Sequence, residues 1–358
     1  MKILRIYTKL PPFLGGMEKH IFNLSKLQLE NNHFVKVFYN DGDAISKNDE
    51  KICNIKVYKI KPQFLGMIPF YLKIVFKLIL NKQQFDIIHI HGDWSSLLFI
   101  KLLKKLTNAK IVVLSLHDQL TPKYTHQKLL PKLVQNIDLI FSTGYDIAKE
   151  LEKLSDKKVI VQPSGINEIF FEKFNKKFDK DIFTIVTVAN LFPKKNIELI
   201  LDIAKELKDF KFMIVGDGSH KTILEIKIKQ ENISNVKLVG FKKPEEVREY
   251  YQKSDVYLLT SFAEGTPTSA LEAMACGLPI VSSNAGGVGS IVKENTNGFV
   301  IDDFDKNRYI QSIKLLNNDI TLRKTIFANN ILLAQNYRWD KVASNITQIM
   351  EQKLNEKN

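Results

Sequence analysis

The strongest constraint on the fold of this chain is a repeated alternation of short apolar runs with amphipathic segments. The runs are rich in Ile and Val and end in small or polar residues, as in residues 86–92 (DIIHIHG) and 183–191 (FTIVTVANL). Such runs are typical of the strands of a parallel sheet that helices cover on both faces. Right-handed connections between them build open, doubly wound sheets. The sequence therefore predicts an α/β fold.

The alternation occurs twice, and 358 residues are too many for one ordinary core. Residues 1–165 form the first set and residues 183–338 the second. Between them, residues 166–182 are charged, aromatic and aperiodic, which predicts a linker. A last helix over 339–354 is expected to pack back on the first domain. Two Rossmann-like domains of this kind would face a cleft at the carboxyl ends of their strands, where such sheets bind ligands.

Cysteine usage and hydropathy exclude several classes of protein. Cys53 and Cys276 are far apart and lack metal-ligand spacing, so neither a disulfide framework nor a zinc site is indicated. Residues 1–10 have the pattern of a strand rather than of a signal peptide, and no run of 18 uncharged apolar residues exists. We therefore expect a cytoplasmic protein that does not span a membrane.

The positive charge is concentrated in the first half of the chain. Of the net +13, residues 1–165 contribute +11, with 25 Lys and Arg against 14 Asp and Glu. This excess predicts an anionic partner. Because no nucleic-acid-binding motif is present, we expect an anionic membrane surface rather than nucleic acid. Residues 64–84, with Lys73 and Lys77, fit either a core-packed helix with a solvated lysine stripe or an interfacial helix on lipid.

The most informative stretch is 261–287, SFAEGTPTSALEAMACGLPIVSSNAGG. Pro267 predicts a helix start, which places Glu264 in the preceding loop and Glu272 about one turn inside the helix. Free backbone N–H groups at a helix start suit a diphosphate, and carboxylates accept hydrogen bonds from sugar hydroxyls. The two carboxylates also fit a simpler interpretation, in which they only complement the helix dipole.

This stretch, EGTPTSALEAMACGLPIV followed by Gly286-Gly287, resembles the signature of the glycosyl transferases group 1 family, the retaining GT-B enzymes of glycosyltransferase family four. The resemblance extends over most of the chain. It implies a GT-B fold of two doubly wound Rossmann-like domains facing a cleft. It also implies transfer of a hexose-type sugar from a nucleotide diphosphate sugar to a hydroxyl of a carbohydrate or lipid-linked acceptor. Surface polysaccharide or glycolipid biosynthesis at the inner face of the cell membrane would be its setting.

The resemblance assigns roles to residues of the second half. Glu272 would hold the ribose hydroxyls and Glu264 would contact the donor sugar. Lys195, in VANLFPKKNIELI, would offset the charge of the leaving diphosphate, although a solvated loop lysine is the simpler alternative. The remaining donor-binding positions are Gly216, Gly218, Gly265, Thr266 and Thr268.

Two positions depart from the family pattern. Asn190 stands where relatives carry an Arg, and Ser290 stands where many carry a Glu. Because Asn has no charge, we expect weaker neutralisation of the diphosphate unless another cation, such as Lys194, compensates.

In the first half, Gly15 and Gly16 precede a helix, where backbone amides would approach the donor diphosphate. The run SLHD ends a strand, so His117 and Asp118 are expected at the rim of the cleft, and the resemblance places His117 near the transferred sugar. His89 and His91 resemble a family segment and are assigned only proximity to the acceptor cleft. A lone histidine at a strand end is also compatible with a purely structural role.

The sequence contains no Ser-His-Asp constellation, metal cluster or P-loop. The resemblance implies a metal-independent reaction without a cofactor, in which the nucleotide sugar is a co-substrate. The acceptor hydroxyl would enter from the face that the diphosphate leaves, with positioning and charge stabilisation as the protein's contribution.

Three alternatives remain open. The first is a UDP-sugar 2-epimerase of the same fold. The second is a non-catalytic GT-B partner subunit, which Asn190 and Ser290 favour. The third is an NAD(P)-dependent Rossmann enzyme with Asp41 after its second strand, but the first turn is Gly-Gly rather than G-x-G-x-x-G. The motifs do not specify the sugar, the nucleotide or the acceptor.

Overall fold

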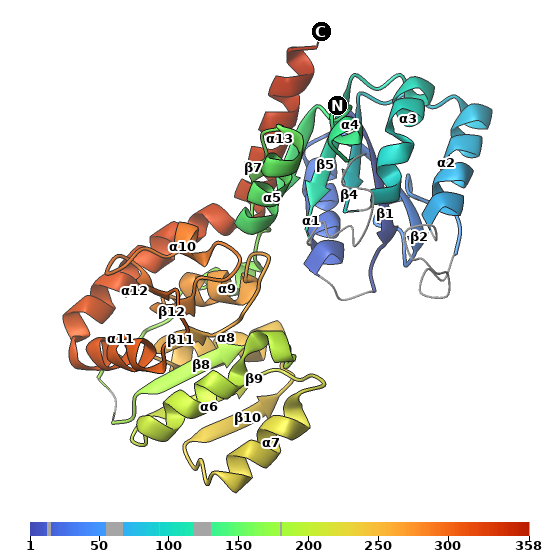
Figure 1. The fold of residues 1–358 in the computed structure, drawn as a ribbon. Coiled ribbons are helices and arrows are strands. Elements are labelled where there is room, and N and C mark those ends of the chain that lie inside the picture. Colours follow the sequence, from blue (N-terminus) through green and yellow to red (C-terminus); the bar gives the residue numbers. More distant parts are fainter. Residues whose placement is uncertain (13–15, 55–66, 93, 118–129, 180, 358) are drawn as a thin grey trace. The chain divides into compact units, whose positions relative to one another are not determined.

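The computed structural model describes residues 1–12, 16–54, 67–92, 94–117, 130–179 and 181–357 (Figure 1). The chain divides into two compact units. The first contains Met1–Gly165 together with Trp339–Asn358, and the second contains Ile166–Arg338. Each unit is built on its own parallel sheet, which confirms the α/β prediction of two doubly wound domains.

The sheet of the first unit has the strand order β3-β2-β1-β4-β5-β6-β7, and every pairing is parallel. The strands are β1 (Lys2–Lys9), β2 (Phe34–Asp41), β3 (Glu50–Lys51), β4 (Ile87–His91), β5 (Ile111–Leu116), β6 (Leu139–Ser142) and β7 (Ile160–Val161). The order reverses direction between β1 and β4. At such a switch point the loops after the two strands diverge to opposite faces of the sheet and leave room for a ligand.

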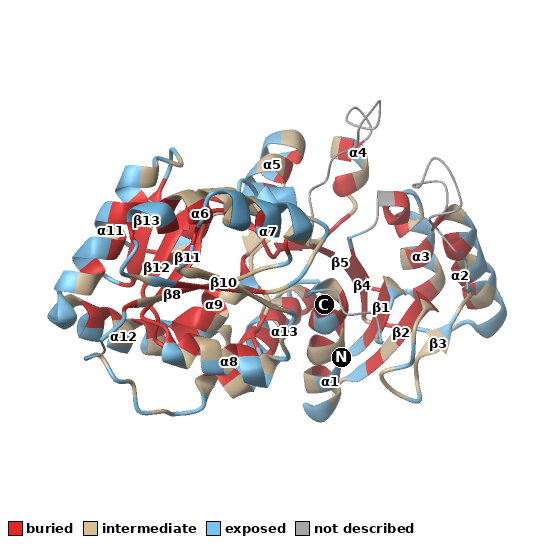
Figure 2. Cartoon of the chain, turned by 90° about the horizontal axis from the view of Figure 1, so that it is seen from below, coloured by how far each residue is buried: buried red, intermediate tan, exposed pale blue. Residues whose placement is uncertain are grey.

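Helices cover both faces of this sheet. They are α1 (Gly16–Glu30), α2 (Ile68–Asn81), η3 (Trp94–Leu98), α3 (Ile100–Thr107), α4 (Leu130–Val134), α5 (Tyr145–Ser155) and α13 (Trp339–Asn355). Neighbouring strand residues point to opposite faces, so Ile88 packs with α2 and α3 whereas Ile87 packs with α1 and α13. Both faces are apolar for this reason, and Figure 2 shows the strands buried under helices whose outer sides are exposed.

The last helix, α13, follows the second unit in the sequence but packs in the first. Val342, Ile346 and Met350 are buried in the core that α1 and the sheet form. Trp339 is part of the same core, and a Cβ atom at Gly165 would collide with its ring. The chain therefore returns to the first unit at Trp339, the place where the sequence pattern predicts the returning helix.

The sheet of the second unit has the order β10-β9-β8-β11-β12-β13 and is also parallel throughout. Its strands are β8 (Thr184–Val188), β9 (Lys211–Val215), β10 (Val236–Gly240), β11 (Val256–Leu259), β12 (Ile280–Ser283) and β13 (Gly298–Ile301). The switch point lies between β8 and β11. The loops that follow these two strands contain the predicted Lys195 and Glu264.

Helices and short 3-10 turns complete the second unit. They are η5 (Glu168–Phe171), η6 (Pro193–Lys195), α6 (Ile197–Glu206), α7 (Lys221–Gln230), α8 (Pro244–Lys253), α9 (Thr268–Ala275), α10 (Val288–Ile291), α11 (Lys306–Asn318), α12 (Ile320–Ala334) and η7 (Gln335–Tyr337). Within the residues that the structure describes, we found no helix capable of spanning a bilayer.

The predicted linker, residues 166–182, needs correction. Ile166 and Phe170 are buried in the core of the second unit, and Asn167 caps η5 by accepting a hydrogen bond from the Ile169 amide. Lys176 donates to two backbone carbonyls at the end of α8. The segment is aperiodic because it forms no long helix. Its aromatic side chains pack on the second unit, so it belongs to that unit and is not a linker between the two.

Candidate functional site

Two loops meet at the switch point of the second unit, one after β8 and one after β11. The Phe262 amide donates to the carbonyl of Lys194 at 2.9 Å. The Thr260 hydroxyl donates to the carbonyls of Lys195 and Asn196, at 3.2 and 2.9 Å. These bonds fix the η6 turn against the end of β11, so the Lys195 backbone is held by the strand that leads to Glu264.

The side chains of Lys195 and Glu264 form an ion pair. Lys195 Nζ lies 2.5 Å from Glu264 Oε1, and the two side chains are only 16% and 8% exposed. The Ser261 hydroxyl donates to the same carboxylate oxygen at 2.6 Å. The structure therefore joins two residues that the sequence predicts separately, in one partly buried charged group at the carboxyl ends of β8 and β11.

Helix α9 begins beside this pair, with Pro267 at its N-cap position. Glu272 lies in the second turn of α9, and the Tyr251 hydroxyl donates to the Ser269 carbonyl at 3.0 Å and to Glu272 Oε2 at 3.4 Å. Burial raises the pKa of the Tyr251 and Tyr257 phenols, so both hydroxyls remain protonated donors at neutral pH. The buried Tyr251 hydroxyl thus contacts the second carboxylate.

Glycines allow these loops to approach one another. Gly286 has a φ of 63°, and a Cβ atom there would collide with the carbonyl oxygens of Gly265 and Glu264. Gly216 has a φ of 139°, and a Cβ atom there would collide with the Ala189 carbonyl. Gly216 therefore has a structural reason to be glycine besides the nucleotide contact expected from the sequence.

Other residues of the second unit that the sequence singled out lie in the loops after β8 and β11 and on α9 and α10. Gly265 and Thr266 are half-buried in the loop between Glu264 and α9, and Thr268 is exposed at the first residue of α9. Asn190 and Lys194 are exposed in the loop after β8, and Ser290 is exposed on α10.

In the first unit, histidines cluster where β1, β4 and β5 end. His91 Nδ1 lies 3.2 Å from His117 Nε2, and the ring of His20 on α1 lies edge-on to His117 with centroids 4.6 Å apart. The ring of His89 lies 4.2 Å from that of His91. His20 was not predicted from the sequence; its signal is its position four residues after Gly16, in the second turn of the helix that the Gly-Gly pair opens.

Burial changes what these histidines contribute. The His91 side chain is 1% exposed and its Nδ1 contacts His117 Nε2, so its predicted proximity to an acceptor cleft would act through His117. Gly16 is exposed at the first residue of α1. The predicted residues Gly15 and Asp118 lie outside the described residues.

The histidine cluster rests on a buried cation. Arg5 of β1 is fully buried and donates to Ser25, to Gln28 Oε1 at 2.8 Å and to His89 Nδ1 at 3.2 Å. Burial lowers the pKa of Arg5 to about 9, so it stays charged at neutral pH.

Burial and this neighbouring charge keep the imidazoles neutral. Burial is the main cause that lowers the pKa of His20, His89 and His91 well below the ordinary value, and the Arg5 charge adds to it. Burial also lowers the pKa of His117 to about 4. At neutral pH the cluster is therefore an uncharged, hydrogen-bonding layer.

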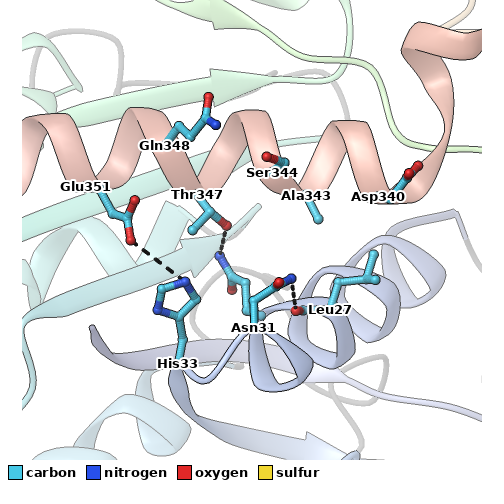
Figure 3. Close-up of a pocket in the computed structure, with 10 residues that line it drawn as sticks. Leu27, Asn31, His33, Asp340, Ala343, Ser344, Thr347, Gln348 and Glu351 are labelled. Atoms are coloured by element: carbon cyan, nitrogen blue, oxygen red, sulfur yellow. Dashed lines mark hydrogen bonds and ion pairs between the residues drawn. The ribbon is translucent and has the colours of Figure 1, made fainter.

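A separate hollow of about 310 Å³ lies between α1 and α13 (Figure 3). His33 and Glu351 face each other across it at 3.8 Å, and Gln28 donates to the Thr347 hydroxyl at 3.0 Å. The predicted site residues do not line this hollow. Across the described part of the chain, no group of three His, Cys, Asp or Glu side chains is placed to hold a metal ion.

Helix α2 exposes apolar side chains on its outer side. Phe70 and Ile74 are buried, as a core-packed helix requires, whereas Phe76 and Leu80 are each 64% exposed. The neighbouring α3 exposes Leu102 beside exposed lysines (α2 and α3 lie side by side in Figure 1). The buried face of α2 fits the core-packed interpretation of residues 64–84, and the interfacial interpretation stays a prediction that concerns its exposed apolar side. Residues 64–66 lie outside the described residues.

Two family models match this chain in succession. The model described as Glycosyltransferase Family 4 matches residues 14–169, and the model described as Glycosyl transferases group 1 matches residues 168–332. Their junction coincides with the boundary between the two structural units.

Relatives and solved structures agree with these matches. An uncharacterized glycosyltransferase of Methanocaldococcus jannaschii is 27% identical over 350 residues, which is 95% of each chain. The phosphatidylinositol N-acetylglucosaminyltransferase gpi3 subunit of Schizosaccharomyces pombe is 24% identical over 97% of this chain and 80% of its own. The fold is that of Anabaena HepE, solved in complex with UDP and glucose, with a TM-score of 0.75 and 19% identity over 98% of this chain and 99% of that one.

Proposed function

Because the chain belongs to the glycosyl transferases group 1 family, we propose that it is a retaining, metal-independent hexosyltransferase that uses a nucleotide diphosphate sugar. The observation that carries the proposal is the Lys195–Glu264 pair, held at the switch point of the second sheet beside the start of α9. A cation, free helix N–H groups and a carboxylate in one place match the chemistry of a diphosphate joined to a hydroxyl-rich sugar.

In the proposed reaction, Lys195 and the first turn of α9 stabilise the negative charge that develops on the diphosphate. Glu264 accepts hydrogen bonds from hydroxyls of the donor sugar, and Glu272 accepts them from the ribose. Gly265, Thr266 and Thr268 supply backbone N–H groups between these two carboxylates. Gly15, Gly16 and His117 of the first unit are assigned to the diphosphate and the transferred sugar.

The chemical step exchanges one bond at the anomeric carbon for another. The bond from the anomeric carbon to the diphosphate oxygen breaks, and the acceptor oxygen bonds the same carbon from the same face. The departing phosphate oxygen takes the proton of the acceptor hydroxyl, so the products are a glycoside and a nucleoside diphosphate. The protein contributes positioning and charge stabilisation, and no metal or cofactor enters the step.

The acceptor is proposed to be a carbohydrate or a lipid-linked sugar at the inner face of the cell membrane. The net +11 of residues 1–165 and the exposed apolar side of α2 support this, because interfacial helices combine apolar contact with attraction to anionic lipid. Lys73 is exposed among these apolar residues, whereas Lys77 is paired with Glu50.

The proposal is tested first by ligand binding and then by product analysis. Nucleoside diphosphates are screened for an increase in melting temperature, since a ligand that binds only the folded state stabilises it. Nucleotide sugars are then offered with carbohydrate and lipid-linked acceptors, and the anomeric configuration of the product is read by NMR. We expect retention for the wild type and a sharp loss of transfer for Lys195→Ala and Glu272→Ala. An inverted product, or transfer at the wild-type rate by both variants, would overturn the proposal.

The same incubations separate the alternatives. A sugar epimerised from a UDP-sugar alone, without an acceptor, would identify a 2-epimerase. The exposed, uncharged Asn190 is the observation that favours a non-catalytic partner subunit. Binding of a nucleotide sugar without transfer or hydrolysis would support that second alternative.

A further inference from the structure

We propose that His91 is a positioning residue that holds His117 in the tautomer protonated on Nδ1, so that His117 offers an N–H donor to its ligand. The proposal rests on the proposed function only in placing that ligand, the transferred sugar, beside His117. The tautomer itself follows from hydrogen bonds within the first unit.

The guanidinium of Arg5 can only donate hydrogen bonds. One of its amino groups lies 3.2 Å from His89 Nδ1, so that nitrogen must be the acceptor. The proton of neutral His89 is therefore on Nε2, which donates to the Ser115 hydroxyl at 2.8 Å. A buried cation thus fixes the first tautomer of the cluster.

The next pair has two arrangements. Between His91 Nδ1 and His117 Nε2, 3.2 Å apart, one neutral ring donates and the other accepts. If His117 donated, the proton of His91 would be on Nε2, which is buried and has no partner among the described residues. A buried N–H without an acceptor is a rarer arrangement than an unfilled lone pair. His91 therefore donates through Nδ1, and His117 carries its own proton on Nδ1.

The surroundings hold the His117 ring in place. His20 packs edge-on against it, and His20 Nδ1 is fixed at 2.8 Å from the Ser164 hydroxyl. The ring of Tyr7 lies 6.3 Å from that of His91, and its hydroxyl donates to buried Glu18 at 3.0 Å. Arg5 bonds to the cluster through His89, and the Glu18 carboxylate is already bonded to Tyr7.

This arrangement determines what His117 can do in the reaction. Its Nε2 lone pair is occupied by His91, so that nitrogen cannot remove a proton from the acceptor hydroxyl. Its Nδ1–H can donate a hydrogen bond to a sugar oxygen. Proton removal is then left to the departing phosphate, as in the proposed reaction.

The tautomer is measured directly by long-range 1H–15N NMR on the full chain at neutral pH. We expect the Nδ1–H pattern for His117 in the wild type. His91→Leu removes the donor, and we expect His117 to shift toward the Nε2–H form that free imidazole favours. His91→Asn places an amide N–H where His91 has Nδ1 and should restore the wild-type pattern. An Nε2–H pattern for His117 in the wild type would overturn the proposal, and this result does not depend on whether a variant folds. A pattern for His117 in His91→Leu that is the same as in the wild type would also overturn it.

Enzyme kinetics give a second test, because a purely structural role of His91 would not produce the same pattern of kcat values among the variants. Loss of one oriented hydrogen bond should lower kcat about tenfold in His91→Leu. His91→Asn should recover most of the activity. His33→Leu, in the separate α1–α13 hollow, should leave kcat unchanged. His117→Asn keeps an N–H near the Nδ1 position and should retain more activity than His117→Gln. Equal kcat values for His91→Leu and His91→Asn would contradict positioning by this bond. If the wild type transfers no sugar, the proposed function fails while the NMR result still decides the tautomer.

Discussion

Lys195 and Glu264 are 69 residues apart in the sequence, and their Nζ and Oε1 atoms lie 2.5 Å apart in the structure. The pair exists because β8 and β11 are neighbours in the sheet, although three helices and two strands separate them along the chain. Each charge is partly buried and compensates the other. A bound diphosphate would compete with Glu264 for the ammonium group, which links donor binding to the position of the carboxylate.

This coupling predicts different effects on stability and on activity. Lys195→Ala removes the cation from the Glu264 carboxylate, which is 8% exposed in the wild type, and leaves it only the Ser261 hydroxyl as a bonding partner among the described contacts. Breaking such a pair should lower the free energy of unfolding by about 3 kcal/mol. The double variant Lys195→Met with Glu264→Gln should recover most of that loss in denaturant titrations, without recovering transfer. Recovery of transfer in the double variant would show that the charges serve stability alone.

The close approach at Gly286 predicts a selective loss of donor binding. Gly286→Ala and Gly240→Ala both place an alanine at positive φ, 63° and 81°, and this backbone strain should cost each about 1–2 kcal/mol of stability. Gly286→Ala should lose more than Gly240→Ala, because its Cβ atom also forces the 264–265 loop to move. Only the Cβ atom at Gly286 would collide with the Gly265 carbonyl, since nothing lies within 4 Å at Gly240. Calorimetric titration with a nucleoside diphosphate should therefore show weaker binding for Gly286→Ala only. Equal affinities for the two variants would contradict the role given to the 264–265 loop.

The neutral histidine cluster predicts acid sensitivity of the first unit. The pKa of His117 is about 4, and that of His20, His89 and His91 is also lowered by burial. The unfolded chain, with histidine pKa values near about 6.5, takes up protons that the folded chain does not, so stability falls as the pH drops below about 6.5. Each such histidine adds to this loss of stability.

Melting temperatures measured from pH 7.5 to 5 check this prediction. His89→Gln removes one buried imidazole and should make the fall shallower. His33→Gln, in the α1–α13 hollow, should preserve most of the fall in melting temperature. A wild-type melting temperature that stays constant over this range would contradict a buried neutral cluster.

The exposed side of α2 predicts binding to anionic vesicles. Phe76 and Leu80 are each 64% exposed, and their replacement by Ser should reduce flotation with anionic liposomes at low salt. Leu332, which is 69% exposed on α12 of the second unit, gives a matched control variant, Leu332→Ser. Flotation that is the same with neutral and anionic vesicles would count against a membrane-binding role of the basic half.

Much of the fold follows from local sequence patterns. Apolar runs such as 183–191 became buried parallel strands, and Pro267 marked the start of α9, because burial on both faces and the fixed φ of proline act locally. The two-residue strands β3 and β7 were not predicted, since two residues are too short to show a periodicity. The segment 166–182 was wrongly predicted to be a linker, because irregular backbone that packs through a few aromatic side chains has no periodic signal.

The candidate site was predictable as a set of residues but not as contacts. Lys195, Glu264 and Glu272 were found through motif resemblance and the ends of strands. Their partners were not, because the bond from Ser261 depends on the turn of the loop before α9, and the bond from Tyr251 depends on how α8 packs beside α9. Tertiary packing also decided that His91 lies beneath His117.

Calorimetric titration of nucleoside mono- and diphosphates into the wild type, Lys195→Ala and Lys194→Ala is the most direct test of a diphosphate site at the Lys195–Glu264 pair. Lys194 is exposed and adjacent, so it controls for a general loss of positive charge. The account predicts that Lys195→Ala weakens diphosphate binding at least about tenfold and monophosphate binding far less, while Lys194→Ala changes both little. Equal diphosphate affinity for the wild type and Lys195→Ala would contradict the account.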